Sequence, residues 1–175
     1  MSWAATASRA EVQARADELA GGAGRVKVLP LAIRAEAAVT VGPYVCIPGH
    51  WACWAAKTVL PHEICGHVAQ YRICGFGSAL AGIPLFGLVY LLLLLPAVFA
   101  LGRMMLEAHA VWEQWKDDAQ QGHNMELITW YDTEHWPKRL WSKSYFWAVP
   151  PVISRALFKH IRYKFLDRHL KGEQK

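Results

Sequence analysis

The pattern of hydrophobic and polar positions predicts helices over most of this chain and short strands in one early region. The first helix has signals at both ends. Ser8 and Glu11 have the spacing of a capping box, an alanine-rich amphipathic run follows them, and Gly21-Gly22 ends the run. These signals predict a helix over about residues 9–20.

The region with β-type patterning lies directly after that helix. Residues 25–31 and residues 36–47 both contain closely spaced valines, and a Gly42-Pro43 turn divides the second stretch. Short runs of β-branched residues bounded by turn signals are typical of strands. We therefore expect a small sheet or a hairpin in this region.

A longer helix is expected next, followed by an apolar stretch. Thr58 is placed to cap this helix, Pro61 would lie in its first turn, where a missing N–H costs little, and the pattern continues to about Cys74. From Phe76 to Gly102 the chain then has no charged residue. Glycines and prolines interrupt this stretch.

Two further helical segments are predicted in the C-terminal half, with a tryptophan-rich region between them. The first begins at Arg103 and continues to about Gln121, and the second follows Pro150-Pro151. The second has apolar residues every fourth position, with lysines and arginines on its other side. These apolar residues are Ile153, Leu157, Ile161 and Phe165.

Composition restricts the possible classes of function only in part. Hydrophobic residues make up 54% of the chain, nine residues are tryptophan, and the formal net charge is +5. The basic residues concentrate in the last helix, and no nucleic-acid-binding module is recognisable, so nucleic acid is not an expected partner. The first residues lack the apolar core of a secretory signal. The four cysteines form no C-x-x-C pair and are expected to be free: Cys46, Cys53, Cys65 and Cys74.

The strongest chemical pattern is the run His-Glu-Ile-Cys-Gly-His at residues 62–67. Zinc peptidases with an H-E-x-x-H motif hold the metal with two histidines one helical turn apart, and the glutamate is the general base. Here the histidines are five residues apart, which in a regular α-helix separates them by roughly 140° around the axis. A π-bulge at Cys65-Gly66 would align His62 with His67, so we predict a local distortion there.

This run and its surroundings resemble small gluzincin-type zinc metallopeptidases, whose active-site helix often reads H-E-x-G-H-V-x-Q. The chain reads His-Glu-Ile-Cys-Gly-His-Val-Ala-Gln at 62–70, with one extra residue, and Arg-x-x-x-Glu-Ala-x-Ala at 103–110 is similar to the helix of the third ligand. The resemblance covers about residues 36–112. It implies a zinc ion bound by His62, His67 and Glu107, with Glu63 as the general base and a peptide or protein as substrate.

Other roles for these residues remain open at this stage. Glu63 and His67 share a helical face and could form a carboxylate-rich di-metal site with Glu107 and Glu113. Both histidines could also be ordinary, partly buried helix residues. Three candidates are available to stabilise an oxyanion in a peptidase, and the sequence does not rank them: Tyr131, His123 and His135.

The apolar stretch 76–102 is long enough to cross a bilayer, since about 20 apolar residues suffice. A single crossing would place Glu107 on the opposite side from His67, so we expect a bent helical hairpin that returns to the same side. Membrane association is therefore predicted, with a protein assembly as the alternative. The residues expected to contact the membrane or partner are Leu91, Leu95, Ile153, Leu157 and Ile161.

Together these patterns predict a single, helix-dominated α+β domain over residues 1–175. A peptidase-like core is expected over about 36–121, containing a small sheet, an active-site helix, an apolar hairpin and a glutamate-bearing helix. A tryptophan-rich basic region would follow over 122–175. The expected function is that of a zinc-dependent peptidase. The alternative is a non-catalytic structural or interaction subunit of a larger membrane or viral assembly.

Overall fold

A computed structural model of the chain describes residues 6–31, 37–92, 98–141 and 149–170. Helices dominate the described residues, and three strands form one small sheet, which confirms the predicted helix-rich α+β class. The chain divides into two compact units, Met1–Leu88 (unit 1) and Val89–Lys175 (unit 2). We describe each unit by itself, and the single-domain organisation stays a prediction.

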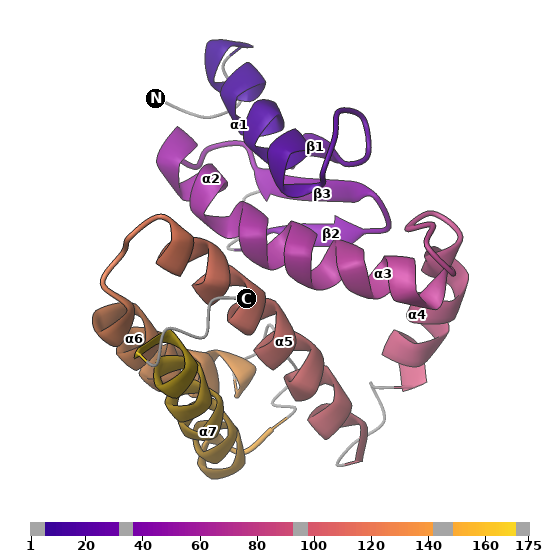
Figure 1. Cartoon of the computed structure of the whole chain (residues 1–175). Helices are drawn as coiled ribbons and strands as arrows, with labels where there is room; N and C mark the ends of the chain where they lie inside the picture. Colours follow the sequence, from indigo (N-terminus) through magenta and orange to yellow (C-terminus); the bar gives the residue numbers. More distant parts are fainter. Residues whose placement is uncertain (1–5, 32–36, 93–97, 142–148, 171–175) are drawn as a thin grey trace. The chain divides into compact units, whose positions relative to one another are not determined.

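Unit 1 begins with helix α1 (Thr6–Leu19), which starts earlier than its sequence signals indicate (Figure 1). Ser8 lies inside this helix and does not cap it. Glu11 does not complete a capping box but accepts a hydrogen bond from Lys57, at 2.7 Å. Gly21 has φ of 74°, in the left-handed region that favours glycine directly after a helix.

The sheet of unit 1 contains the strands expected before the His-Glu run. Its strands are β1 (Lys27–Leu31), β2 (Val39–Val41) and β3 (Tyr44–Pro48), in the order β1-β3-β2. Strand β1 is parallel to β3, and β2 is antiparallel to it across the Gly42-Pro43 turn. Strand β2 is therefore an outer strand of the sheet.

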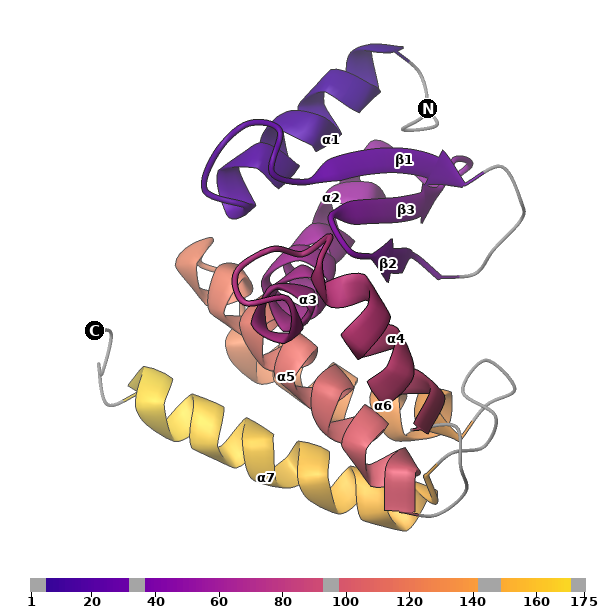
Figure 2. The ribbon, with the colours of Figure 1, turned by 90° about the vertical axis from the view of Figure 1, so that its right-hand side faces the viewer.

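A long, continuous helical segment follows the sheet and carries the His-Glu run. It consists of α2 (Cys53–Pro61), a π-helical stretch η1 (His62–Val68) and α3 (Ala69–Cys74). Figures 1 and 2 show this segment and α1 against the sheet. Buried aliphatic side chains from all three parts form the core: Val12, Ala16, Val26, Val45, Ile47, Leu60 and Val68.

The predicted start of this helical segment was wrong. Ala52, in an extended conformation, precedes the first helical residue, so Thr58 lies inside α2 and its hydroxyl donates to the Trp54 carbonyl oxygen. Pro61 is consequently the last residue of α2 and not part of its first turn. A threonine can bond to a carbonyl four residues earlier as readily as it caps a helix, and the sequence does not separate the two roles.

The uncharged stretch 76–102 begins with a loop over residues 76–81 and continues into helix α4 (Gly82–Leu92) and the start of helix α5 (Val98–Gln120). Leu91 belongs to α4, and Leu95 lies outside the described residues. Within the part of the chain that the structure describes, no helix combines the length and apolar character that a membrane crossing requires. The return of the chain in a hairpin stays a prediction.

Among the described residues of unit 2, the helices α5, α6 (Met125–Leu140) and α7 (Pro151–Leu170) surround an aromatic core. Trp115, Trp136, Phe158 and Phe165 are its largest buried side chains. Helix α7 begins where the paired prolines predict. Leu157 and Ile161, expected to contact a membrane or partner, pack partly against this core, whereas Ile153 is 46% exposed.

Candidate metal centre

The π-helical stretch η1 covers the residues for which a local distortion was predicted. The Ala69 N–H donates to the Ile64 carbonyl oxygen five residues earlier, which is the hydrogen bond of a π-helix. This bonding winds the chain more loosely than the roughly 3.6 residues per turn of an α-helix, so five residues make little more than one turn. The rings of His62 and His67 consequently meet edge to face, with centroids 5.0 Å apart.

Two residues give a local reason for the π-helix at this position. Pro61 has no N–H to continue the ladder of α2, and the N–H of the next residue, His62, donates to the Val59 carbonyl oxygen only three residues earlier. Gly66 has the lowest helix propensity of any residue but proline and tolerates the altered backbone. The regular helix is thus interrupted directly before and inside the His-Glu run.

Glu63 is held by a strand and not by its own helix. It is 5% exposed, and its Oε2 accepts a 2.6 Å hydrogen bond from the Thr40 hydroxyl on β2. The Tyr71 hydroxyl on α3 donates to the main-chain oxygen of the same threonine, at 3.2 Å. Burial raises the pKa of Tyr71 further above neutral pH, so its hydroxyl remains a donor. The sheet and the helical segment together fix the carboxylate.

His67 is oriented by a neighbour on the following helical turn. Its Nδ1 lies 3.1 Å from Gln70 Oε1. Because an amide oxygen only accepts hydrogen bonds, Nδ1 carries the proton in this arrangement and Nε2 keeps the lone pair that a metal ion needs. Gln70 is the glutamine of the V-x-Q sequence that follows the His-Glu run.

The structure places the three predicted ligand residues in one group. His62, His67 and Glu107 each offer a ligand atom, and these atoms all lie within 4.8 Å of one another, so the group could hold a metal ion. His62 and Glu107 are each 5% exposed, and His67 is half-buried. Glu107 belongs to α5.

The residues that would extend this group to a di-metal site have other partners. Glu113 forms an ion pair with Lys116, at 2.8 Å, and Glu63 bonds to Thr40. Neither glutamate belongs to the group of three within the described residues. These contacts do not favour the carboxylate-rich alternative.

The three candidates for stabilising an oxyanion all lie in unit 2. Tyr131 and His135 stack on α6 with ring centroids 5.4 Å apart, and burial lowers the pKa of His135. His123 Nδ1 lies 3.1 Å from the Asp118 carboxylate. Their assignment to the site stays a prediction.

Sequence reasoning missed the residues that orient the site. Thr40 lies in a strand of alternating valines, where nothing marks it as different from any solvent-facing threonine. Tyr71 carries no signal either, because its hydroxyl reaches a strand 31 residues away. Gln70 matches the glutamine of the H-E-x-G-H-V-x-Q pattern, but the resemblance implied no role for it.

The four cysteines are free, as expected, and each is half-buried. No protein-family model, curated protein or solved structure matches this chain. The site is therefore interpreted from its own residues and geometry.

Proposed function

We propose that this chain is a zinc-dependent peptidase in which Glu63 is the general base. The observation that carries the proposal is the π-helical turn, which brings His62 and His67 together although their spacing would separate them in a regular helix. A π-helical turn is rare and is frequent at functional sites. Here it aligns two imidazoles beside a buried glutamate.

The donor set fits zinc better than it fits other common ions. Two imidazoles and one carboxylate form a typical catalytic zinc set, whereas calcium and magnesium prefer oxygen ligands alone. Within the described residues the group has three members. Three protein ligands leave a coordination position for water or substrate, as in catalytic zinc sites.

Each residue has a definite task in this proposal. His62, His67 and Glu107 would hold Zn²⁺, which supplies Lewis-acid activation of a peptide carbonyl and of water. Thr40 donates to Oε2 of Glu63 and leaves Oε1 to accept a proton. Gln70 holds His67 in the tautomer that presents Nε2.

Strand β2 offers a way to bind the substrate. It is an outer strand, and its second edge pairs with no other strand among the described residues. Val39 and Val41 are 48% and 43% exposed. An extended peptide could add to such an edge through main-chain hydrogen bonds, next to the strand residue that holds Glu63.

The test combines metal analysis with a hydrolysis assay on the full chain. Wild-type protein purified with zinc should contain about one zinc per molecule and cleave an unfolded protein substrate, and a chelator should abolish cleavage. Glu63→Gln should keep the zinc and lower cleavage by at least about a hundredfold, because it removes the base and no ligand. His62→Ala, His67→Ala and Glu107→Gln should each lose zinc.

Matched variants separate the site from general effects on the protein. His50→Ala and Glu113→Gln change an exposed histidine and a glutamate paired with Lys116, and both should keep zinc and activity. Wild-type protein without bound zinc would contradict the proposal. Zinc without cleavage of any peptide would support the non-catalytic subunit, and loss of metal in Glu63→Gln would support a carboxylate-rich site.

A further inference from the structure

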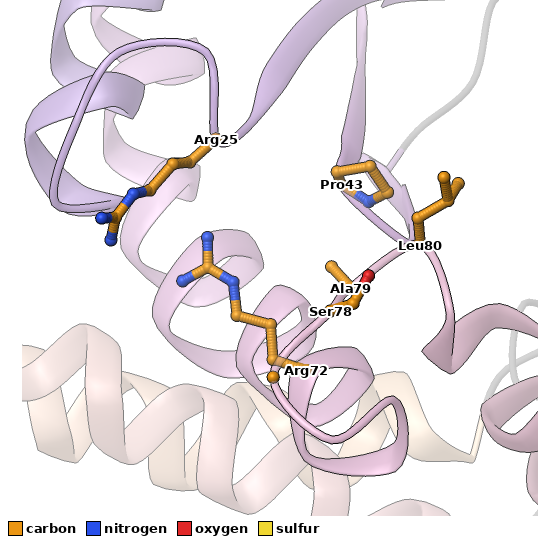
Figure 3. Close-up of a pocket in the computed structure, with 7 residues that line it drawn as sticks. Arg25, Pro43, Arg72, Ser78, Ala79 and Leu80 are labelled. Atoms are coloured by element: carbon orange, nitrogen blue, oxygen red, sulfur yellow. The ribbon is translucent and has the colours of Figure 1, made fainter.

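A second site lies in unit 1, on the loop that follows α3. A pocket of about 370 Å³ is lined there by two arginines, Arg25 and Arg72, together with Pro43 and the loop residues 77–80. The arginines come from chain positions 47 apart. Figure 3 shows the guanidinium group of Arg72 reaching from α3 into the space between Arg25 and Pro43.

The two positive charges in this pocket are not neutralised by acidic side chains. Neither arginine forms an ion pair with a carboxylate of the described residues. The Asp17 carboxylate, on the helix before Arg25, instead accepts hydrogen bonds from the Gln13 amide, at 2.9 Å, and the Gly24 N–H, at 3.3 Å. Two guanidinium groups that line one pocket without a counter-charge favour an anion with several acceptor oxygens, such as a phosphate.

The last turn of α3 and the loop after it expose large apolar side chains beside the pocket. Phe76 is 98% exposed, Ile73 is 74% exposed, and Leu80, which itself lines the pocket, is 60% exposed. Phe76 also has φ of 51°, a conformation that a bulky aromatic residue rarely adopts. The loop thus holds an aromatic ring out in solvent in an unfavourable backbone conformation.

Close backbone contacts fix this loop to the end of α3. A Cβ added to Gly75 would collide with the Ser78 carbonyl oxygen, and one added to Gly82 would collide with the Tyr71 carbonyl oxygen. Only glycine permits these approaches. These contacts hold the turn that carries Phe76 in a fixed position relative to α3.

We propose that this surface binds an anionic phospholipid membrane, with a lipid phosphate in the Arg25–Arg72 pocket and Ile73, Phe76 and Leu80 in the interfacial region of the bilayer. A free phosphate would use the arginines and leave the apolar side chains in water. A lipid offers both parts, since its charged headgroup lies directly above an apolar layer. The proposal does not depend on the metal centre.

The experiment is co-sedimentation of the full chain with phosphatidylcholine vesicles, with and without phosphatidic acid. The chain should bind the vesicles that contain phosphatidic acid and bind plain vesicles much more weakly. Arg25→Gln and Arg72→Gln should each weaken binding by about fivefold or more, the effect of one basic residue at an anionic surface. Arg9→Gln removes the same charge from exposed α1 and should have a much smaller effect.

A second pair of variants tests the exposed apolar side chains of this surface. Phe76→Ser should weaken binding by about tenfold, because a fully exposed ring can transfer its whole surface into lipid. Trp54→Ser, which removes another exposed aromatic side chain of unit 1, should leave binding unchanged. Circular dichroism on every variant shows whether the fold is kept. Because Arg25 is exposed and lies outside α3, its variant tests the pocket without disturbing that helix.

Several results would overturn the proposal. These are equal binding to both kinds of vesicle, no binding to either, or the same loss in Arg9→Gln as in the pocket variants. A titration with inorganic phosphate distinguishes the source of the anion. Binding of phosphate to the wild type, lost in Arg72→Gln, without any binding to vesicles would show a site for a soluble anion instead.

Discussion

The buried polar side chains of the two units differ in where they form hydrogen bonds. In unit 2, Thr129, Thr133 and Ser154 are buried, and each hydroxyl donates to a main-chain oxygen three or four residues earlier. These donated bonds are local and satisfy the hydroxyl groups. Contacts between the helices combine aromatic packing with a few polar bonds, such as the one from Arg162 Nε on α7 to the Thr129 hydroxyl on α6, at 3.1 Å.

In unit 1 the corresponding bonds connect different elements. Thr40 donates to Glu63 from a residue 23 positions away, and Tyr71 donates back to the main chain of Thr40. Bonds of this kind fix a side chain of one element relative to another, which a reactive group requires. The comparison shows that the hydroxyl groups around Glu63 connect separate elements, whereas the buried hydroxyl groups of unit 2 donate locally along their own chain segment.

The largest expected effect comes from deleting one residue in each kind of helix. Deleting Ala110 rotates the rest of regular α5 by about 100° and removes Trp115 from its core position, so unit 2 should lose its cooperative unfolding. Deleting Cys65 should convert the π-helical turn to a regular one and leave the two histidines one α-turn apart. We expect zinc binding to survive, measured by metal content and thermal denaturation. Equal damage from both deletions would contradict the role of η1.

A smaller effect is expected from truncating the aromatic core of unit 2. Trp115 is fully buried, and its Nε1 donates to Asp132, at 2.7 Å. Trp115→Ala should lower the free energy of unfolding by about 3–5 kcal/mol. Trp130→Ala, at a side chain 54% exposed in the same unit, should change it by less than about 0.5 kcal/mol. Chemical denaturation measures both, and similar values would show that the core does not depend on Trp115.

Removing one hydroxyl from each unit tests the comparison directly. Thr40→Val and Thr133→Val keep the side-chain shape, and each should cost about 1 kcal/mol of stability for the lost hydrogen bond. Only Thr40→Val should also lower kcat, by about tenfold with zinc content unchanged, because it frees the Glu63 carboxylate to turn. A loss of activity in Thr133→Val of the same size would contradict the assignment of roles.

The smallest effect concerns the pH dependence of stability in unit 2. Burial raises the pKa of Asp118, and its contact with His123 opposes this only in part. The folded state therefore binds this proton more tightly than the unfolded state, so stability falls as pH rises from the ordinary value of 3.8 through the raised pKa. Asp118→Asn should remove that slope in denaturation curves recorded across acidic pH. A steeper slope in the variant would reverse the sign and contradict the argument.

Local signals in the sequence located several elements correctly. The Gly42-Pro43 turn and its flanking valines predicted β2 and β3, and the paired prolines predicted the start of α7. The five-residue spacing of His62 and His67 predicted a distorted helix. In each case the cause is a property of neighbouring residues, such as a missing N–H or a preferred turn.

Helix α6 was missed because its buried face is partly polar. Thr129 and Thr133 are buried on the same helix as Met125 and Trp136, so polar residues interrupt the hydrophobic periodicity of its inner face. Their hydroxyls can be buried only because the carbonyl oxygens of the same helix accept their hydrogen bonds. These hydrogen bonds exist only in the folded helix, so a hydropathy pattern does not reveal them.

By itself, the sequence determined the helix-rich class and the strand region, because turn chemistry and periodicity act over a few residues. The set of residues able to hold a metal ion came from a resemblance to a known pattern, since Glu107 lies far along the chain from the two histidines. The tertiary structure alone decided that Thr40 and Tyr71 hold Glu63, and that Arg25 and Arg72 line one pocket. These pairs come from distant positions, and their proximity follows from how the sheet packs against the helical segment, which no local pattern specifies.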